Sequence, residues 1–368
     1  MNMKPKKKRK AWFAGVLTIT FTLSLFVNLF STPVIRAAKD VEENEMDSIA
    51  MDRSDLSARN MVFLYSGHFG DGQRYIPYES AELERLDTVR QFVIAIDNKT
   101  NKIDNYKERN MIDDVNETVQ TIVDTNSEYK VLVSLPAHDV SSKLNVDQLF
   151  DEYVSYIKEL KRKLGPNWDS VTGFYYPNEA IYFYGTQNYS YSQLKNQSQV
   201  QLLEKLSEYI KNSDDVDGAT SFAWAPYYGF GPNREKIVET IAYIVDETMI
   251  FDDVYIQPHY YFDKDSAINL QPIYDSVKEG RIYGDGGRLV AKNHLDKTKI
   301  GIQMEIDSGY FTDTGKRERY DQTVDKFKEL LGEKGRFSFY MGSKGLINRF
   351  NIPYFKEILD KVNEFYTK

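Results

Sequence analysis

The sequence predicts one α/β domain of the (β/α)8 barrel class, preceded by an N-terminal signal peptide. Eight short β-rich runs alternate with segments whose apolar residues recur at helical spacing, and this alternation implies a parallel sheet covered by helices. Eight such units can close into a TIM barrel, which takes ~250 residues or more and fits within the 368 residues of this chain. The runs lie at 61–67, 91–97, 130–136, 171–177, 219–227, 253–261, 299–307 and 336–342.

The N-terminus has the pattern of an export signal. Residues 4–10 (KPKKKRK) are basic, residues 11–30 are apolar, and two alanines follow at 37–38. This order is typical of a signal peptide, which we place at 1–38. The apolar run also has the ~20 residues that span a bilayer, so an uncleaved membrane anchor is the alternative. In both cases we expect the folded domain to be secreted or at the cell surface, behind an acidic linker at 39–58.

The barrel domain, placed at 59–368, has strand-like runs with two unlike faces. In 299–307, isoleucine and methionine at even positions alternate with glycine, glutamine, glutamate and aspartate at odd positions. An apolar face towards the helices and a smaller or more polar face towards the interior is typical of barrel strands. An open doubly wound sheet is the alternative. However, the first turn, 66–72, is glycine-rich without the GxGxxG spacing that nucleotide folds carry.

Amphipathic stripes predict the helices between the runs. The clearest stripe covers 149–164, where apolar residues recur at helical spacing until Gly165-Pro166 stops the helix. A second stripe covers 237–245, and a third at 355–365 predicts the last helix of the barrel. Such helices bury one face against the sheet and leave the other in solvent.

Composition excludes several kinds of site. The chain has no cysteine, which rules out disulfides, thiolate zinc sites and cysteine nucleophiles. A net charge of −8 argues against nucleic acid as a main partner, because phosphate binding needs a basic surface. Tyrosine (27) and phenylalanine (21) far outnumber tryptophan (3), and tyrosine suits sugar faces as well as half-buried strands. We expect a monomer without a cofactor.

Polar and aromatic residues gather at the carboxyl ends of the predicted strands, where barrel chemistry is found. Three of the 4 histidines fall there. Two glutamates, Glu179 and Glu305, close the fourth and seventh runs. The other residues expected to contact a substrate are Tyr65, His68, Asp97, His138, Asn178, Trp224, Tyr227, Gln257, His259, Tyr261, Asp307 and Tyr340.

The two glutamates form the pair that glycosidic cleavage needs. One carboxylic acid protonates the leaving oxygen, and a second carboxylate attacks the anomeric carbon or activates water. Strand ends four and seven lie across a barrel mouth and can hold two carboxyls ~5 Å apart, the spacing of a retaining enzyme. Burial and a neighbouring anion would keep the acid protonated near neutral pH.

Neighbouring residues are expected to serve the same chemistry. Asn178 is expected to hydrogen-bond a sugar hydroxyl next to the anomeric carbon. His259 and Tyr261 are expected to orient or polarise Glu305. The stacking walls are expected from Trp224, Tyr227 and Tyr340. Together these residues predict a polysaccharide or oligosaccharide as the partner.

Short motifs at these ends resemble clan A of the glycoside hydrolases. They are Asn178-Glu179 at end four, His259-x-Tyr261 at end six and Glu305 at end seven. In that clan the residue after the strand-four asparagine is the acid/base and the strand-seven glutamate is the nucleophile, so the resemblance implies these roles here. His138 also matches a strand-three histidine of part of the clan. Tyr340 departs from the pattern, since the clan commonly has tryptophan at strand eight.

Longer phrases carry a second resemblance. GFYYPNEAIYFYG, FAWAPYYGFG, YIQPHYYF and IGIQMEID are similar to an uncharacterised family of bacterial exported proteins, domain-of-unknown-function family number 4855. The match covers most of the mature chain and implies no settled activity.

Two other functions stay open. A metal-dependent hydrolase would bind zinc through residues such as His68, His138, His259, Asp97 and Asp307, but the HxH and HExxH spacings do not occur, so we expect no metal. A non-catalytic carbohydrate-binding barrel at the cell surface would use the same aromatic strand ends. A carboxyl separation of ~5 Å favours retention and ~6.5–9.5 Å inversion, whereas a much larger one favours binding alone.

Overall fold

The structure is a computed structural model that describes residues 60–69, 72–97, 101–139, 144–181, 191–229, 234–332, 335–345 and 352–367. The predicted signal peptide at 1–38 and the linker at 39–58 lie outside the described residues. Within those residues, no helix has the length and apolar character needed to cross a bilayer. All of them belong to the second of the two units into which the chain divides, Met51–Lys368.

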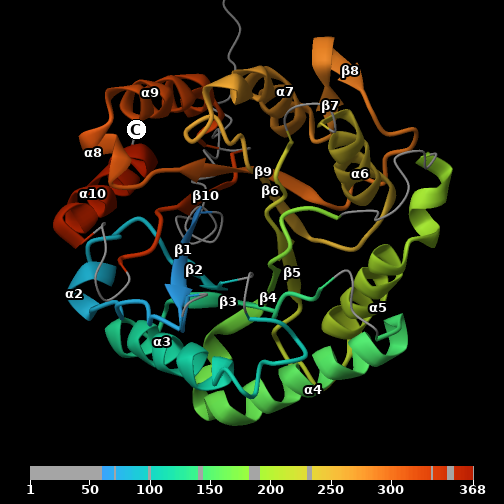
Figure 1. The fold of residues 1–368 in the computed structure, drawn as a ribbon, viewed down its shortest axis with the longest axis vertical. Coiled ribbons are helices and arrows are strands. Elements are labelled where there is room, and N and C mark those ends of the chain that lie inside the picture. Colours follow the sequence, from blue (N-terminus) through green and yellow to red (C-terminus); the bar gives the residue numbers. More distant parts are fainter. Residues whose placement is uncertain are drawn as a thin grey trace, which may run out of the picture. The chain divides into compact units, whose positions relative to one another are not determined.

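Eight parallel strands close into a barrel, which confirms the predicted fold class (Figure 1). The strands are β1 (Asn60–Ser66), β2 (Gln91–Ile96), β3 (Lys130–Ser134), β4 (Val171–Tyr176), β5 (Ser221–Trp224), β6 (Asp253–Ile256), β9 (Lys299–Glu305) and β10 (Phe337–Tyr340). Around the barrel their hydrogen-bonded order is β1, β10, β9, β6, β5, β4, β3, β2. The ring closes where β10 pairs with β1, with Phe339 opposite Val62.

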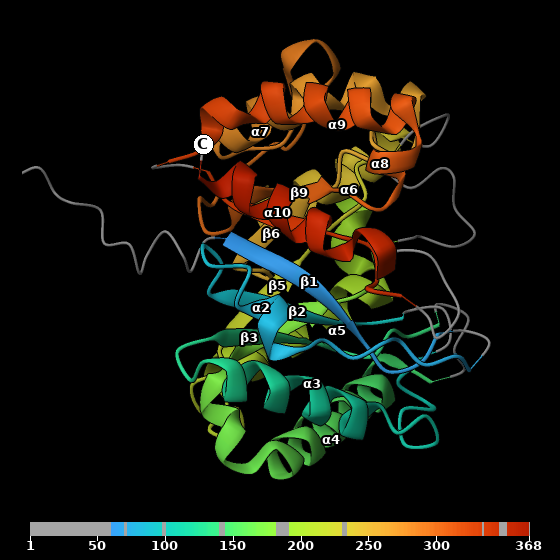
Figure 2. The same ribbon diagram turned by 90° about the vertical axis from the view of Figure 1, so that its left-hand side faces the viewer.

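Helices cover the outside of the barrel. They are α2 (Ser80–Leu83), α3 (Met111–Thr125), α4 (Val146–Leu164), α5 (Ser198–Asn212), α6 (Arg234–Glu247), α7 (Leu270–Glu279), α8 (Gly309–Thr312), α9 (Thr314–Phe327) and α10 (Phe355–Tyr366). The 3₁₀ turns are η1 (Gly165–Ser170), η2 (Tyr191–Asn196), η4 (Lys264–Asn269), η5 (Asp285–Gly287), η6 (Lys328–Leu330) and η7 (Ile352–Tyr354). Figure 2 shows α3 and α4 on one side of the strands and α7 and α9 on the opposite side.

The predicted helical stripes fall in α4, α6 and α10, and most of their apolar residues are buried. Local signals set the ends of α4. The Asn145 side chain accepts a hydrogen bond from the Gln148 amide, and the Gln148 side chain accepts one from the Asn145 amide, both at 3.0 Å. The helix ends at Gly165, whose φ of 52° is easy for glycine and hard for other residues.

Two predicted runs extend past their strands. The runs 219–227 and 253–261 contain β5 and β6, which both stop before the runs end. Pairing continues past them as one isolated parallel bridge between Tyr227 and Gln257. Pro258 then follows, and because proline has no N–H with which to continue a ladder, residues 259–261 follow loop geometry.

A small hairpin separates the sixth and seventh barrel strands. Strands β7 (Tyr283–Gly284) and β8 (Arg288–Leu289) pair antiparallel between α7 and β9 and form a sheet of their own. The seventh barrel strand is therefore β9, which carries Glu305 at its carboxyl end.

The core has an outer and an inner layer. A large apolar cluster lies between strands and helices and contains the even-numbered residues of β9. A smaller cluster inside the barrel contains Phe63, Tyr175 and Tyr255. Gly301 is required on the inner face, because a Cβ there would lie only 2.9 Å from the Tyr255 ring. The predicted division of strand faces is thus confirmed.

Candidate active site

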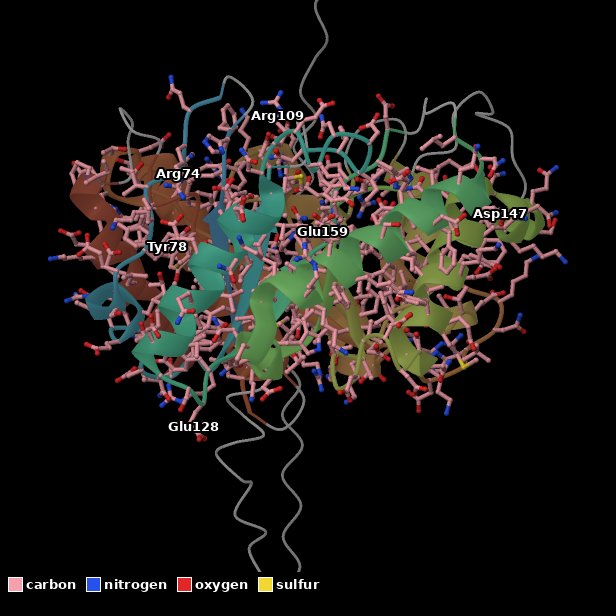
Figure 3. The ribbon with its side chains drawn as sticks, turned by 90° about the horizontal axis from the view of Figure 1, so that it is seen from below. Arg74, Tyr78, Arg109, Glu128, Asp147 and Glu159 are labelled. Carbon is pink, nitrogen blue, oxygen red and sulfur yellow. The ribbon has the colours of Figure 1, made fainter. Side chains whose placement is uncertain are left out.

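A cavity of ≈ 450 Å³ opens at the carboxyl ends of the barrel strands. Figure 3 marks this end by Arg109, which precedes α3, and the other end by Glu128, which leads into β3. The volume lies within the ~300–1,000 Å³ common for small-ligand sites. Of the residues predicted at strand ends, the lining contains Tyr65, Asp97, Glu179, Gln257, His259, Glu305 and Tyr340.

Glu305 is the buried carboxyl of the predicted pair. It ends β9 on the inner face and is 5% exposed. Burial raises its pKa to about 8, and the charge of Glu179 acts in the same direction. The backbone amides of His259 and Tyr261 oppose this shift by stabilising the anion. Burial therefore favours the protonated form of Glu305 in the free protein.

His259 has an unusual backbone conformation beside this carboxyl. Its φ is 61°, in the left-handed region. A non-glycine residue adopts such a conformation at a cost on the order of 1–3 kcal/mol, which the surrounding structure has to offset. Strain of this kind concentrates at functional sites, and here it falls on the residue whose amide acts on Glu305.

Glu179 is the exposed carboxyl of the pair. It follows β4 and lines the same cavity. Burial is the main cause of the raised pKa values of Tyr65 and Tyr340, and the charge of Glu179 contributes to both. Its carboxylate therefore lies within electrostatic reach of these phenols and of Glu305. Its backbone is held in place, because its carbonyl accepts the Tyr227 amide at 2.9 Å.

Aromatic rings form a continuous series along the β1, β10 and β6 side of the mouth. This series, here called the aromatic arc, runs in the order Phe69, Tyr75, Tyr65, Tyr340, Phe262, His259 and Tyr227. Successive ring centroids lie 6.3, 5.4, 6.0, 5.8, 5.6 and 5.2 Å apart. These spacings fall within the ~4.5–7 Å of favourable aromatic pairs, so each ring fixes the next. All the rings of the arc except that of Tyr227 line the cavity.

Carboxyl and amide groups complete the lining. Asp97, which follows β2, is 6% exposed. Burial and, next, the charge of Asp97 raise the pKa of Tyr75, so Asp97 lies near one end of the aromatic arc. Gln257 is fixed by its Nε2, which donates to the Ala225 carbonyl at 2.6 Å. The site thus combines ring faces with hydrogen-bonding groups, as sugar recognition requires.

Trp224 lies outside the cavity, which corrects its expected role as a stacking wall. Its indole is 1% exposed, stacks on Phe251 at 5.3 Å and donates its Nε1–H to the Asn178 carbonyl at 2.9 Å. Strand alternation is the reason: Ala223 belongs to the cluster inside the barrel, so the next residue faces the helices. Tyr227 contacts the His259 ring but does not line the cavity.

His138, His68 and Asn178 also lie outside the cavity lining, so their expected contact with substrate stays a prediction. His138 Nδ1 lies 3.1 Å from the Tyr153 hydroxyl, and burial lowers its pKa to about 4. His68 Nδ1 lies 3.1 Å from an Asp114 carboxylate oxygen on α3. The Asn178 amide donates to the His138 carbonyl, at 3.5 Å. Among the described residues, no three His, Asp or Glu side chains converge to hold a metal.

Tyr261 and Asp307 belong to a linked group away from the cavity lining. The Tyr261 hydroxyl donates to Asp307 Oδ1 at 2.7 Å, and Lys316 Nζ lies 3.0 Å from Asp307 Oδ2. The Tyr261 side chain is therefore turned towards Asp307, while its backbone amide acts on Glu305. These contacts hold the end of β9 against α9.

Several cavity residues do not follow from reading strand ends. Gln303 could have been predicted from the sequence, because it precedes Glu305 by two positions and residues two apart on a strand share a face. Phe69 and Tyr75 come from the loop after β1, and Phe262 from the loop after β6. Loops have no side-chain period, so alternation could not have found these three.

Among the comparisons with known proteins, only those with solved structures find proteins that are similar to this chain. No family model and no curated protein matches this chain. It is similar to a psychrophilic glycoside hydrolase family 10 endo-β-1,4-xylanase (11% identity, covering 78% of this chain and 88% of that one, TM-score 0.46). It is also similar to a Thermoanaerobacterium saccharolyticum intracellular xylanase (14% identity, covering 77% of this chain and 85% of that one, TM-score 0.44). A third similar structure is the catalytic domain of a family GH18 chitinase from the fern Peteris ryukyuensis (14% identity, covering 82% of this chain and 98% of that one, TM-score 0.41).

Proposed function

We propose that the protein is an exported glycoside hydrolase-like barrel that acts on a polysaccharide. The observation that carries the proposal is a buried Glu305, whose pKa burial raises, together with an exposed Glu179 in one cavity at the barrel mouth. Two carboxyls, one of which holds a proton, are what acid-assisted glycosidic cleavage requires. The aromatic arc beside them supplies surface for sugar stacking.

In the proposed retaining mechanism Glu305 is the nucleophile and Glu179 is the acid/base. Glu179 protonates the leaving oxygen while Glu305 attacks the anomeric carbon, and a glycosyl ester forms. Water activated by Glu179 then cleaves this ester and restores both groups. Because attack needs the ionised form, Glu305 has to lose its proton before the first step. The amides of His259 and Tyr261 favour that anion.

The free protein's electrostatics favour a second assignment, in which Glu305 is the proton donor. A buried carboxyl of raised pKa is the usual acid of such a pair, and Glu305 is the buried one here. Glu179 would then be the nucleophile or the base that activates water. The carboxyl separation in a ligand complex and the anomer released first distinguish these assignments from inversion.

A non-catalytic carbohydrate-binding barrel remains the alternative function, because the same arc and carboxyls can hold a sugar without cleaving it. The test is a screen of the purified protein on bacterial and plant glycans with reducing-end detection, and Glu305→Ala serves as the inactive control. Reducing ends released by the wild type alone support the enzyme. Binding at the mouth without release from any glycan supports the binding barrel. If no glycan is bound and none is cleaved, both the enzyme and the binding barrel are contradicted.

Export and family membership are proposed from sequence features. The basic and apolar segment at 1–38 supports export, and cell fractionation should find the barrel outside the cytoplasm. Full-length chain confined to the cytosol would contradict this. We also propose membership of domain-of-unknown-function family number 4855. The sequence segments that resemble this family contain the cavity residues Glu179, Gln257, His259 and Glu305. Members that have the same segments would therefore have the same site.

A further inference from the structure

The chain that follows β1 folds back on itself beside the cavity. Its described residues 67–69 and 72–75, here called the ribbon, pair antiparallel, with His68 opposite Arg74. In such a pair, opposite residues point to the same face, and their neighbours along the chain point to the other face. The ribbon therefore has two faces, and one of them carries both His68 and Arg74.

The other face of the ribbon belongs to the cavity. Phe69 and Tyr75, which follow His68 and Arg74 in sequence, both line the cavity, and their ring centroids lie 6.3 Å apart. They form one end of the aromatic arc, which Tyr75 joins to Tyr65 at 5.4 Å. Because this end of the arc comes from the ribbon and not from a barrel strand, its position depends on what holds the ribbon.

The face with His68 and Arg74 is held by Asp114 on α3. His68 Nδ1 lies 3.1 Å from Asp114 Oδ2, and Arg74 Nη2 lies 3.4 Å from Asp114 Oδ1. Arg74 also pairs with Glu117, one turn further along the same helix. Each oxygen of the Asp114 carboxylate therefore contacts one of the two side chains on this face of the ribbon.

The burial of Asp114 shows that this contact is closely fitted. Asp114 is 8% exposed, and burial raises the pKa of its carboxyl, while His68 and then Arg74 oppose that shift. A carboxylate removed from water is unfavourable unless positive or hydrogen-bonding groups face it. The ribbon backbone comes close as well, since a Cβ at Gly67 would lie 3.0 Å from Asp114 Oδ2. Asp114 is therefore buried against the ribbon.

We propose that Asp114 is a positioning residue for sugar binding, which holds the ribbon so that its two rings form a sugar subsite at one end of the cavity. The inference rests on the proposed function and deepens it, because it extends the binding site beyond the carboxyl pair. Asp114 does not belong to the cavity lining, so it acts through the ribbon and does not touch the sugar.

Further contacts hold the backbone of this segment, so loss of Asp114 should displace the rings without unfolding the barrel. The Asn101 side chain donates to the His68 carbonyl at 3.2 Å. Directly after the ribbon, the Ile76 amide donates to the Gly345 carbonyl at 2.9 Å. The expected effect is therefore a weaker sugar complex formed by a folded protein.

Calorimetric titration of the purified protein with cellohexaose, xylohexaose and the chitin hexamer tests the inference. All proteins carry Glu305→Gln, so that the ligand is not cleaved during the titration. Asp114→Asn keeps the shape of the side chain but removes its charge, and it should raise Kd about 3- to 10-fold. A merely structural role would lower the number of binding sites per protein molecule and leave Kd unchanged.

Removal of the two rings shows whether Asp114 acts through them. In a background with Phe69→Ala and Tyr75→Ala, Asp114→Asn should have no further effect on Kd, because the rings that it positions are absent. Asp113→Asn is the matched control. Asp113 is the preceding residue on α3, is exposed and pairs with Lys163, so its replacement should leave Kd unchanged.

An unchanged Kd in Asp114→Asn, or an equal rise with and without the two rings, would overturn the inference and leave the proposed function untouched. If none of the three hexamers binds, the proposed function and the inference both fail. If Asp114→Asn does not fold, His68→Ala removes the same contact from the partly exposed side of the ribbon, and the same comparison with and without the rings decides.

Discussion

Glu305 and Glu179 share one cavity but differ in almost every physical respect. Glu305 ends a strand, is 5% exposed and has a pKa raised to about 8 by burial. Glu179 lies beyond the end of its strand and is exposed. Their strands, β9 and β4, are separated in the barrel by β6 and β5. The difference teaches that, for two residues of the same type, place relative to the end of the strand decides how deeply the carboxyl is buried.

The largest effect should come from removing each carboxyl in turn. If Glu305 is the nucleophile, Glu305→Ala should lose turnover by on the order of 10⁴-fold or more, and azide should restore cleavage with inverted stereochemistry. Glu179→Ala should lose about 10²–10⁴-fold on glycans but spare the first step with activated leaving groups, which need no proton. Steady-state rates on a confirmed substrate measure both effects.

Glu318→Ala on the exposed face of α9 is the matched control and should keep wild-type rates. Azide rescue of Glu179→Ala in place of Glu305→Ala would exchange the two roles. Wild-type rates in both cavity variants would remove the carboxyl pair from the mechanism.

The pH dependence of kcat/KM tests the same difference without mutation. Glu305 is protonated below its pKa of about 8, and a nucleophile acts only when ionised. If Glu305 attacks, kcat/KM should rise towards pH 8. If Glu305 is the proton donor, the same ionisation removes the active form, so kcat/KM should fall as the pH passes 8. The apparent pKa of the pH–rate profile belongs to the coupled pair of carboxyls. Whether kcat/KM rises or falls with pH decides which role Glu305 has.

The stability of the fold should depend on the ionisation of Glu305. Because folding raises the pKa of Glu305, its favourable contribution is complete below the unfolded-state value, about 4.5, and is lost as the pH rises through about 8. Glu305→Gln, which stays neutral, should therefore raise the free energy of unfolding at pH 8 by roughly 4 kcal/mol and change it little at pH 4. Denaturant titrations at both pH values measure this, and an equal effect at pH 4 and pH 8 would contradict it.

The barrel was predictable because two simple periods determine it. Alternation along 299–307 separates the residues that face the helices from those that face the interior, and helical spacing along 149–164 identifies α4. Strand order in a closed parallel barrel then follows from chain order. The ends of β5 and β6 were overextended, because local β-propensity does not show where a proline ends the ladder.

The site was predictable only as far as strand alternation extends. Glu305 and Tyr340 end their strands on the inner face and were placed correctly in the cavity. Trp224 was assigned to the mouth by its position in a run, although its place next to inward-facing Ala223 turns it outward. Tyr75 reaches the cavity from a loop whose path depends on tertiary contacts. Such contacts leave no local pattern in the sequence.

The smallest expected effect concerns Tyr340, whose phenol interacts electrostatically with both Glu179 and Glu305. Burial is the main cause that raises its pKa to about 12, and the charges of Asp307, Glu179 and Glu305 add to it. Its ring joins Tyr65 to Phe262 in the aromatic arc. Tyr340→Phe keeps the ring, so oligosaccharide affinity should stay close to that of the wild type. Tyr340→Ala removes the stacking surface and should weaken binding by about 1 kcal/mol, or roughly fivefold in Kd.

Calorimetric titration with a confirmed oligosaccharide ligand measures this effect. Tyr310→Ala, on the short helix α8 and outside the cavity lining, controls for the loss of a tyrosine elsewhere. If Tyr340→Phe weakens binding as much as Tyr340→Ala, the hydroxyl matters and the ring does not. The arc would then be a support for the carboxyls, and sugar recognition would belong to the polar groups around Glu305.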